Sequence, residues 1–258
     1  VYKTASKPMS NKVIECESLE EAISSSRILV LPIPVTADGI SIKSIYSDSD
    51  LTLKTLYKNI NKKHFIFGGK FPLSLKSLCN EFEILWHDFM LDEPTAILNS
   101  IATAEGCIMK AISKSVYNLH SSNCLVLGYG KCGSTLSHKL SGMGANVTVA
   151  ARKATARCNA LSAGYKAISI NDICAFSSNN CKCINDLKLD SYKFIFNTIP
   201  FCILTPDVLD LLSKDAIIID IASYPGGVDF EYASSLNIYA ELYLGIPGDV
   251  SPKSSRSE

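Results

Sequence analysis

Three spaced glycines, Gly128, Gly130 and Gly133, follow an apolar segment directly and open a helical pattern. A β-branched segment comes next, so the motif lies in a strand–helix–strand unit. The first glycine permits a tight turn, the second lets the main chain approach a pyrophosphate, and the third lets the helix pack closely on the sheet. Amides at the helix start also favour an anion. The residues expected to contact a dinucleotide here are Gly128, Tyr129, Gly130, Lys131, Cys132 and Gly133.

The charge at the end of the second strand of this unit separates the two nicotinamide dinucleotides. In an NAD-binding unit this strand commonly ends in Asp or Glu, which accepts hydrogen bonds from the ribose hydroxyls. Here it ends in Arg152 and Lys153, whose guanidinium and ammonium groups suit a phosphate. The alternative is a pair of solvated cations at a helix start, where the helix dipole disfavours them. The pair therefore favours NADP over NAD.

Two further segments lie at the ends of predicted strands. The string "FNTIP" (196–200) ends the fourth strand of the dinucleotide unit, and "DIASYPGGVDF" (220–230) ends the fifth. Open α/β sheets bind ligands at this edge, although an ordinary turn is the alternative for each string. We expect cofactor contacts from Asn197, Thr198, Ile199, Pro200 and Ser223, and substrate contacts from Gly226 and Gly227.

Strand-like and helical segments alternate along the whole chain, which predicts an α/β fold with two lobes. Each lobe is expected to be a parallel sheet flanked by helices, and the second to be a Rossmann dinucleotide-binding fold. A long helical pattern beginning at Asp92 suits a connector between them. The predicted divisions are 1–118 for the N-terminal substrate or catalytic lobe with this helix, 119–243 for the NADP-binding domain, and 244–258 for a C-terminal return segment toward the first lobe.

Candidate substrate residues come from the first lobe and the connector. The strings "LPIP" (31–34) and "FGGK" (67–70) follow strands and are candidate walls of a ligand cleft. On the connector, "ATAEG" (102–106) places a hydroxyl, a carboxylate and a glycine within about one helical turn. Its Glu105 is a candidate general acid or base, although helix glutamates usually lie at the surface. The substrate contacts expected here are Pro32, Pro34, Gly68, Gly69 and Thr103.

The composition excludes several classes of function. Lys and Arg together number 25, as do Asp and Glu, so no long-range field favours nucleic acid or an anionic membrane. No apolar run reaches the roughly 18 residues of a membrane-spanning helix, and no signal-peptide core is present, which predicts a cytoplasmic protein. The histidines show no metal-ligand spacing. Cys174, Cys181 and Cys183 are expected in a polar surface loop rather than in a zinc site.

Several strings together resemble one family, the A subunits of dipicolinate synthase. The two most specific are "DIASYPGGVDF" and, after it, "GIPGDVSPKS" (245–254), and the resemblance covers most of the chain. Ala102 and Tyr224 stand where the family pattern has proline and lysine. Residues 176–186 look like an insertion, and the first strand and helix and the last helix of the family are expected to be missing. The other matching strings are "RILVLPIPVTADGI" (27–40), "IFGGK" (66–70), "LNSIATAEG" (98–106), "FNTIP" and the glycine segment 126–153.

The resemblance implies NADP-dependent oxidation of 2,3-dihydrodipicolinate to dipicolinate, in the cytoplasm of the mother cell of a sporulating bacterium. It also implies, as the partner, a flavoprotein-like B subunit of dipicolinate synthase, and it leaves a homo-oligomer open. The reaction needs a hydride acceptor, a proton acceptor and donors for two carboxylates. Glu105 and Lys253 are the expected catalytic residues. Two alternatives stay open: an NADP-dependent dehydrogenase of another small acid, and a non-catalytic nucleotide-binding subunit.

Overall fold

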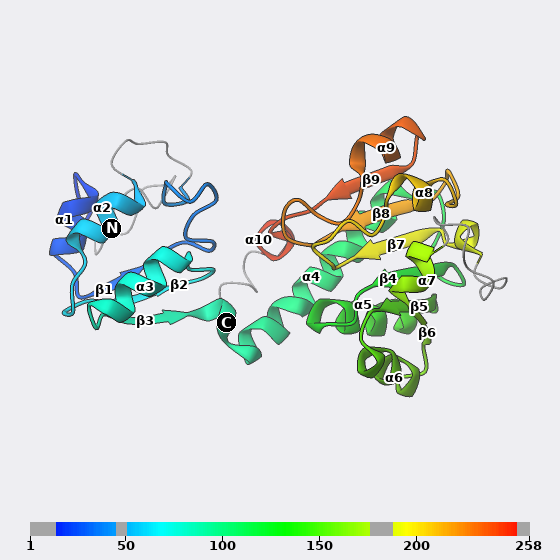
Figure 1. Cartoon of the computed structure of the whole chain (residues 1–258), viewed down its shortest axis with the longest axis horizontal. Coiled ribbons are helices and arrows are strands. Elements are labelled where there is room, and N and C mark those ends of the chain that lie inside the picture. The colour runs from blue at the N-terminus through cyan, green and yellow to red at the C-terminus, as the bar shows by residue number, and fades with distance from the viewer. Residues whose placement is uncertain (1–13, 45–50, 176–187, 252–258) are drawn as a thin grey trace. The chain divides into compact units, whose positions relative to one another are not determined.

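The computed structural model describes residues 14–44, 51–175 and 188–251. Contacts divide the chain into two compact units, Val1–Ala96 and Ile97–Glu258 (Figure 1). Some predicted features lie outside the described residues, namely Cys181, Cys183, Lys253 and the insertion at 176–186, and the side chain of Cys174 is not described either.

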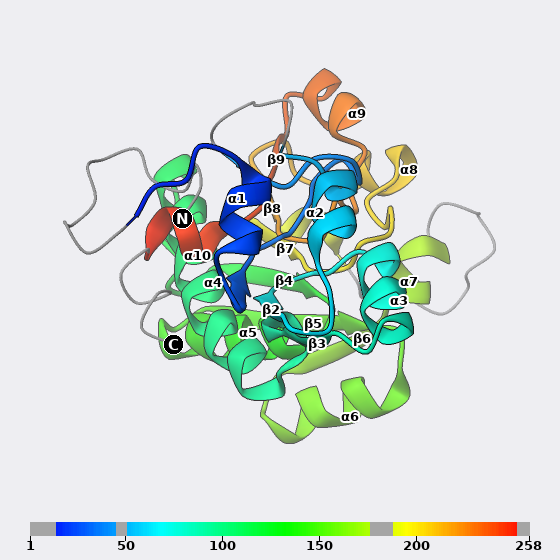
Figure 2. The ribbon, with the colours of Figure 1, turned by 90° about the vertical axis from the view of Figure 1, so that its left-hand side faces the viewer.

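The first unit is built on a three-stranded parallel sheet in the order β1-β2-β3. Its register places Leu29 opposite Ile66, and Ile66 opposite Trp86. Two of its helices, α1 and α2, lie side by side (Figure 2). Hydroxyls of Ser18 and Thr52 accept from first-turn amides and begin these helices. The elements are α1 (Leu19–Ser24), β1 (Ile28–Val30), α2 (Leu53–Asn59), β2 (Phe65–Gly68), α3 (Leu73–Glu81), β3 (Leu85–Asp88) and the 3-10 turn Phe89–Leu91.

One face of this sheet carries the core of the unit. Leu29 and Ile66 pack there with apolar residues of all three helices in a single cluster. Side chains alternate between the faces of a strand, so the opposite face carries Ile28, Val30 and Leu85. These three are 61%, 74% and 66% exposed. The first unit therefore buries one face of its sheet and leaves an apolar face exposed.

The second unit contains a six-stranded, wholly parallel sheet in the order β6-β5-β4-β7-β8-β9. This order reverses direction between β4 and β7, which is the point where Rossmann sheets bind dinucleotides. The glycine motif follows β4 and "FNTIP" begins at the end of β7, so both lie at this point. The strands are β4 (Asn123–Leu127), β5 (Asn146–Ala151), β6 (Lys166–Ser169), β7 (Phe194–Asn197), β8 (Ile217–Asp220) and β9 (Tyr239–Leu242).

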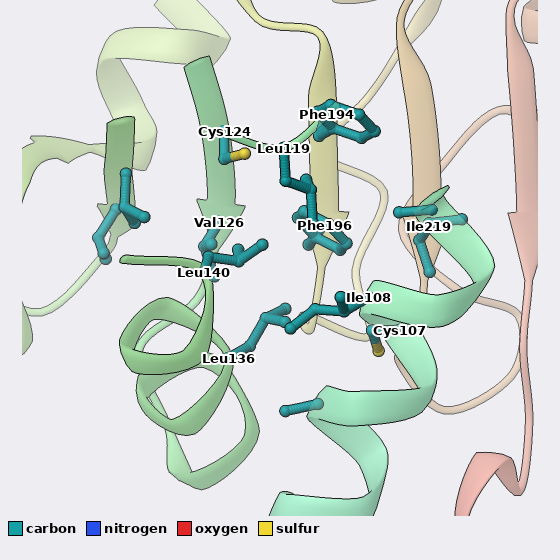
Figure 3. Packing of buried hydrophobic residues seen from close by; sticks show 14 of the residues in the cluster. Cys107, Ile108, Leu119, Cys124, Val126, Leu136, Leu140, Phe194, Phe196 and Ile219 are labelled. Carbon is teal, nitrogen blue, oxygen red and sulfur yellow. The ribbon is translucent and has the colours of Figure 1, made fainter. Parts of the chain in front are cut away.

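Helices cover both faces of the second sheet, because two separate apolar clusters lie on its two sides. Figure 3 shows one of them, in which Ile108 of α4 and Leu136 of α5 point toward Val126 and Phe196 on the strands. The helices in this cluster are α4 (Glu93–Lys114), α5 (Lys131–Gly142), α6 (Ala154–Ser162) and α10 (Ile246–Val250). Those in the other are α7 (Ile170–Ala175), α8 (Pro206–Leu209) and α9 (Phe230–Ser235).

The predicted fold class is confirmed: the chain has two parallel sheets flanked by helices, and the second is a Rossmann fold. The connecting helix α4 packs with the second unit through Ala104, Cys107 and Ile108, and the division falls at Ala96 and Ile97 rather than after residue 118. No helix formed by the described residues combines the length and apolarity needed to cross a bilayer.

Candidate dinucleotide-binding site

The glycine turn between β4 and α5 has no room for side chains at two of its three glycines. Gly128 has φ +99°, and a Cβ there would overlap Oγ1 of Thr198. A Cβ at Gly133 would overlap the carbonyl oxygen of Gly128. A Cβ at Gly130 would meet nothing within 4 Å. Gly128 and Gly133 are thus required by the protein's own packing, whereas the open space at Gly130 is available to a ligand.

Thr198 joins this turn to the end of β7. Its backbone N–H and its Oγ1–H both donate to the carbonyl oxygen of Leu127, each over 2.9 Å. The N–H of Gly128 in turn donates to the carbonyl of Ala150 over 2.8 Å, so the ends of β4, β5 and β7 are tied together. Thr198, predicted as a cofactor contact, therefore also holds the turn in shape.

The start of α5 is suited to an anion. Gly130 is the N-cap and makes no side-chain capping hydrogen bond, and amides at a helix start favour an anion. Burial raises the pKa of the Cys132 thiol, although Lys131 opposes the shift. Burial, followed by Tyr165, likewise raises the pKa of Tyr129. Both groups are therefore neutral at neutral pH and place no negative charge beside a phosphate.

Asn197 and Asp220, at the ends of β7 and β8, are fully buried and bonded to each other. Asn197 Nδ2 donates to Asp220 Oδ1 over 3.0 Å and to the carbonyl of Ile199 over 3.0 Å. Asn197 Oδ1 accepts from the N–H of Ile199 over 3.1 Å. The carboxamide of Asn197 is thus fully engaged within the protein, and it fixes the position of the loop 198–200. Its predicted role as a cofactor contact stays a prediction.

Asp220 organises the loop that contains the two glycines predicted to bind substrate. Its Oδ1 accepts from the N–H of Ala222 over 2.8 Å, and its Oδ2 from the N–H of Gly227 over 2.7 Å. A Cβ at Gly227 would overlap Asn197 Nδ2, and one at Gly226 would lie 2.8 Å from Asp220 Oδ2. Both glycines are therefore required by this buried network. Ser223, Tyr224 and Pro200 are exposed, and Ile199 is half-buried.

The end of β5 carries cations only. Arg152 and Lys153 are exposed, and neither side chain has a hydrogen-bond or ion-pair partner among the described residues. Arg157, one turn into α6, is half-buried, and its Nη1 donates to the carbonyls of Ala151 and Arg152 over 2.9 and 2.7 Å. We did not predict Arg157 from the sequence. Its spacing of one helical turn after Lys153 is the signal that points to it.

The predicted residues of α4 are held within the second unit. Lys139 of α5 donates to Glu105 Oε1 over 2.8 Å, and Oε2 has no partner in the described chain. Thr103 Oγ1 donates to the carbonyl of Asn99 over 2.8 Å. A Cβ at Gly106 would overlap Cγ2 of Ile246, so this glycine lets α10 dock closely on α4. The predicted return segment thus begins with a helix packed on the connector.

The predicted substrate glycines of the first unit pack tightly against neighbouring loops. A Cβ at Gly68 would lie 2.6 Å from the ring of Phe71, and one at Gly69 would lie 2.8 Å from Ile33. The N–H of Val35, after Pro32 and Pro34, donates to the carbonyl of Gly69 over 3.1 Å. The loops after β1 and β2 are therefore joined, and the roles of Pro32, Pro34, Gly68 and Gly69 in substrate binding stay predictions.

Buried Asp88 fixes the loop after β2 from the end of β3. Its two oxygens accept from the amides of Lys70, Phe71 and Met90 over 2.9 to 3.1 Å, and Lys76 Nζ lies 3.3 Å away. Burial alone would raise the pKa of Asp88, but these donors outweigh it and hold the pKa below its usual value. Asp88 is therefore an ionised structural residue, which the sequence reading missed.

A histidine–carboxylate pair also lies at the end of β3. His87 Nε2 and Asp92 Oδ2 are 2.8 Å apart, and the His87 ring contacts Phe67 and Phe89 edge-on. The described residues contain no group of three or more His, Cys, Asp or Glu that could hold a metal ion.

The fold and the glycine turn define the class of protein: a two-unit α/β chain whose second unit is a Rossmann-type dinucleotide-binding fold. The transhydrogenase from Sinorhizobium meliloti has a TM-score of 0.61 with this chain, at 11% identity, over 92% of this chain and 72% of that one. At this identity the likeness concerns the fold alone.

The relatives identify the family more narrowly. Residues 1–90 match the N-terminal domain of the dipicolinate synthase A subunit. The dipicolinate synthase A subunit of Bacillus subtilis (strain 168) is 31% identical over 244 residues, which are 94% of this chain and 78% of the relative. The crystal structure of the dipicolinate synthase A subunit from Bacillus halodurans matches with a TM-score of 0.82 at 27% identity, over 98% of this chain and 84% of that one. The chain belongs to the family of dipicolinate synthase A subunits, and the resemblance is confirmed.

Proposed function

We propose that this chain binds NADP and oxidises 2,3-dihydrodipicolinate to dipicolinate, as the A subunit of a dipicolinate synthase. The observation that carries the cofactor assignment is the end of β5, where Arg152, Lys153 and Arg157 lie together without a carboxylate partner among the described residues. An acidic residue at this place would accept from the ribose hydroxyls of NAD and repel a 2′-phosphate. Family membership carries the choice of reaction.

Different segments at this edge of the sheet are proposed to bind different parts of the dinucleotide. The glycine turn and the start of α5 suit the pyrophosphate, because both present backbone donors and Gly130 leaves open space. The loops after β7 and β8, including Ile199, Pro200 and Ser223, are proposed to lie at the nicotinamide end. When bound there, the nicotinamide supplies the hydride acceptor.

The oxidation removes two hydrogens from the ring of the substrate. A hydride leaves one of the two saturated ring carbons for NADP⁺, a proton leaves the other, and the products are dipicolinate, NADPH and the protonated base. We assign the proton to Glu105, because Lys139 holds its Oε1 and leaves Oε2 without a partner in the described chain. Substrate contacts by Thr103, Gly226 and Gly227, by Gly68 and Gly69 of the first unit, and by Lys253 stay separate predictions.

The proposal also includes a partner subunit and a cellular location. The relative's name describes it as one subunit of a synthase, which supports an assembly with another subunit. We propose that this partner is the flavoprotein-like B subunit. We propose that the complex works in the cytoplasm of the mother cell during sporulation.

A turnover assay tests the reaction. Dihydrodipicolinate is generated enzymatically under anaerobic conditions, so that oxygen cannot oxidise it, and is mixed with this chain and NADP, with and without the B subunit. We expect dipicolinate absorbance to rise when the B subunit is present, and to rise more slowly at subsaturating NADP when Gly130→Ala replaces the unmodified chain. Absence of dipicolinate under both conditions would contradict the proposed reaction and favour another small acid or a non-catalytic role.

A further inference from the structure

We propose that Arg157 selects NADP over NAD by occupying the backbone acceptors at the end of β5. Its Nη1 donates to two successive carbonyls, Ala151 over 2.9 Å and Arg152 over 2.7 Å. The next residue, Lys153, begins α6 as its N-cap. These two carbonyls therefore lie where the strand ends and an adenosine ribose would be placed in a Rossmann unit.

NAD and NADP need different hydrogen-bonding groups from the protein at the 2′ position of the adenosine ribose. The 2′-hydroxyl of NAD donates a hydrogen bond and needs an acceptor, whereas the 2′-phosphate of NADP accepts only and needs donors. Because Arg157 donates to both carbonyls, one lone pair of each is already engaged, and a ribose hydroxyl placed at residues 151 and 152 competes with the guanidinium for these acceptors. A hydroxyl placed there therefore makes a weaker hydrogen bond than it would to two carbonyls without this guanidinium.

The same guanidinium also adds donors. An arginine has five N–H groups, and both of those on Nη1 are used by the two carbonyls. The Nε and Nη2 groups of Arg157 have no partner among the described residues. Arg157 is half-buried while Arg152 and Lys153 are exposed, so its position is the most restricted of the three. One residue thus competes for the acceptors and supplies donors.

This inference rests on the proposed binding of NADP at the glycine turn, and it predicts a signature that separates Arg157 from Arg152. Arg152→Ala removes a donor and should weaken NADP binding while NAD binding stays unchanged. Arg157→Met keeps an unbranched apolar stem but frees the two carbonyls. It should weaken NADP binding about tenfold and strengthen NAD binding about threefold to fivefold. A gain in NAD affinity is not expected from the loss of a merely structural residue.

The test titrates the unmodified chain, Arg152→Ala, Arg157→Met and Arg157→Lys with NADP and with NAD by calorimetry, after circular dichroism shows that each variant is folded. The lysine variant keeps one donor group and should lie between the unmodified chain and Arg157→Met for both cofactors. The lysine variant also decides the question if the methionine variant does not fold.

Two outcomes are distinguishable. Unmodified chain that shows no preference for NADP would overturn the proposed cofactor. A clear NADP preference together with unchanged or weaker NAD binding in both Arg157 variants would overturn the inference about Arg157 and leave the cofactor assignment in place.

Discussion

Asn197 Nδ2 donates to Asp220 Oδ1 over 3.0 Å, and both side chains are fully buried. This bond joins the ends of β7 and β8, so the loops that follow these strands share one support. The Asp220 side chain also accepts from the N–H groups of Ala222 and Gly227. Each of its hydrogen-bond partners in the described chain is therefore a donor. The two loops at the proposed nicotinamide end are therefore expected to depend on a single carboxylate.

Replacing that carboxylate with an amide should cost stability. Asp220→Asn turns one oxygen into an N–H₂ group that faces a donor, and a buried unsatisfied pair costs about 1–3 kcal/mol. Urea unfolding measures the change. The control is Asp215→Asn, because Asp215 is 64% exposed and lies 3.8 Å from Lys193, so its loss should cost less than about 1 kcal/mol. Equal costs for the two variants would contradict the role assigned to Asp220.

The glycine turn offers a matched pair of substitutions. Gly133→Ala places a Cβ against the Gly128 carbonyl and should lower the free energy of unfolding. Gly130→Ala meets open space, with φ −88° and ψ −163°, and should change stability by less than about 1 kcal/mol. It should nevertheless weaken dinucleotide binding by tenfold or more, which is about 1.4 kcal/mol. Normal binding by Gly130→Ala would show that the pyrophosphate does not approach this residue.

The close packing of α10 on α4 predicts that the effect of Gly106→Ala on stability changes sign when Ile246 is shortened. Gly106→Ala overlaps Ile246 in the unmodified chain, and overpacking of this kind costs about 1–3 kcal/mol. Ile246→Ala removes the overlapping Cγ2 and alone should cost about 2–5 kcal/mol, since the side chain is buried in the core. In that background, Gly106→Ala should become stabilising by up to about 1 kcal/mol through helix propensity. A double-mutant cycle in urea measures both values, and additive effects would exclude the contact.

Asp88 makes the stability of the chain depend on pH. Its folded pKa lies below the ordinary value near 3.8, so its contribution is complete above that value and is lost as the pH falls toward the folded pKa. We expect amide exchange at Phe71 and Met90 to accelerate below about pH 4, beyond the intrinsic change. Asp88→Asn should remove this acid dependence, whereas Glu81→Gln, at the exposed end of α3, should keep it. Identical exchange profiles for all three proteins would contradict the account.

The architecture follows from the sequence because it depends on local patterns. Alternating strand-like and helical segments, together with one glycine turn, were sufficient to predict two parallel sheets and the Rossmann fold of the second. The helices α7 and α10 have six and five residues, which is too short for a periodic pattern to emerge.

The side-chain contacts that hold the site in shape could not be predicted from local sequence patterns. Asn197 reads locally as the end of a strand, but its partner Asp220 is 23 residues away, and only the pairing of β7 with β8 brings them together. Arg157 reads as an ordinary helix cation, because nothing in the sequence shows that its side chain turns back to the strand. Glycines 68, 69, 226 and 227 were explained by ligand approach, and the structure supplies packing as a second reason for each.

The proposal that this chain oxidises dihydrodipicolinate with NADP is tested most directly by stoichiometry. In the anaerobic assay with the B subunit, NADPH and dipicolinate are quantified together as the reaction proceeds. The account predicts that they appear in equal amounts, and that NAD in place of NADP slows both to the same extent. Dipicolinate formed without NADPH, or at the same rate when NADP is omitted, would contradict it.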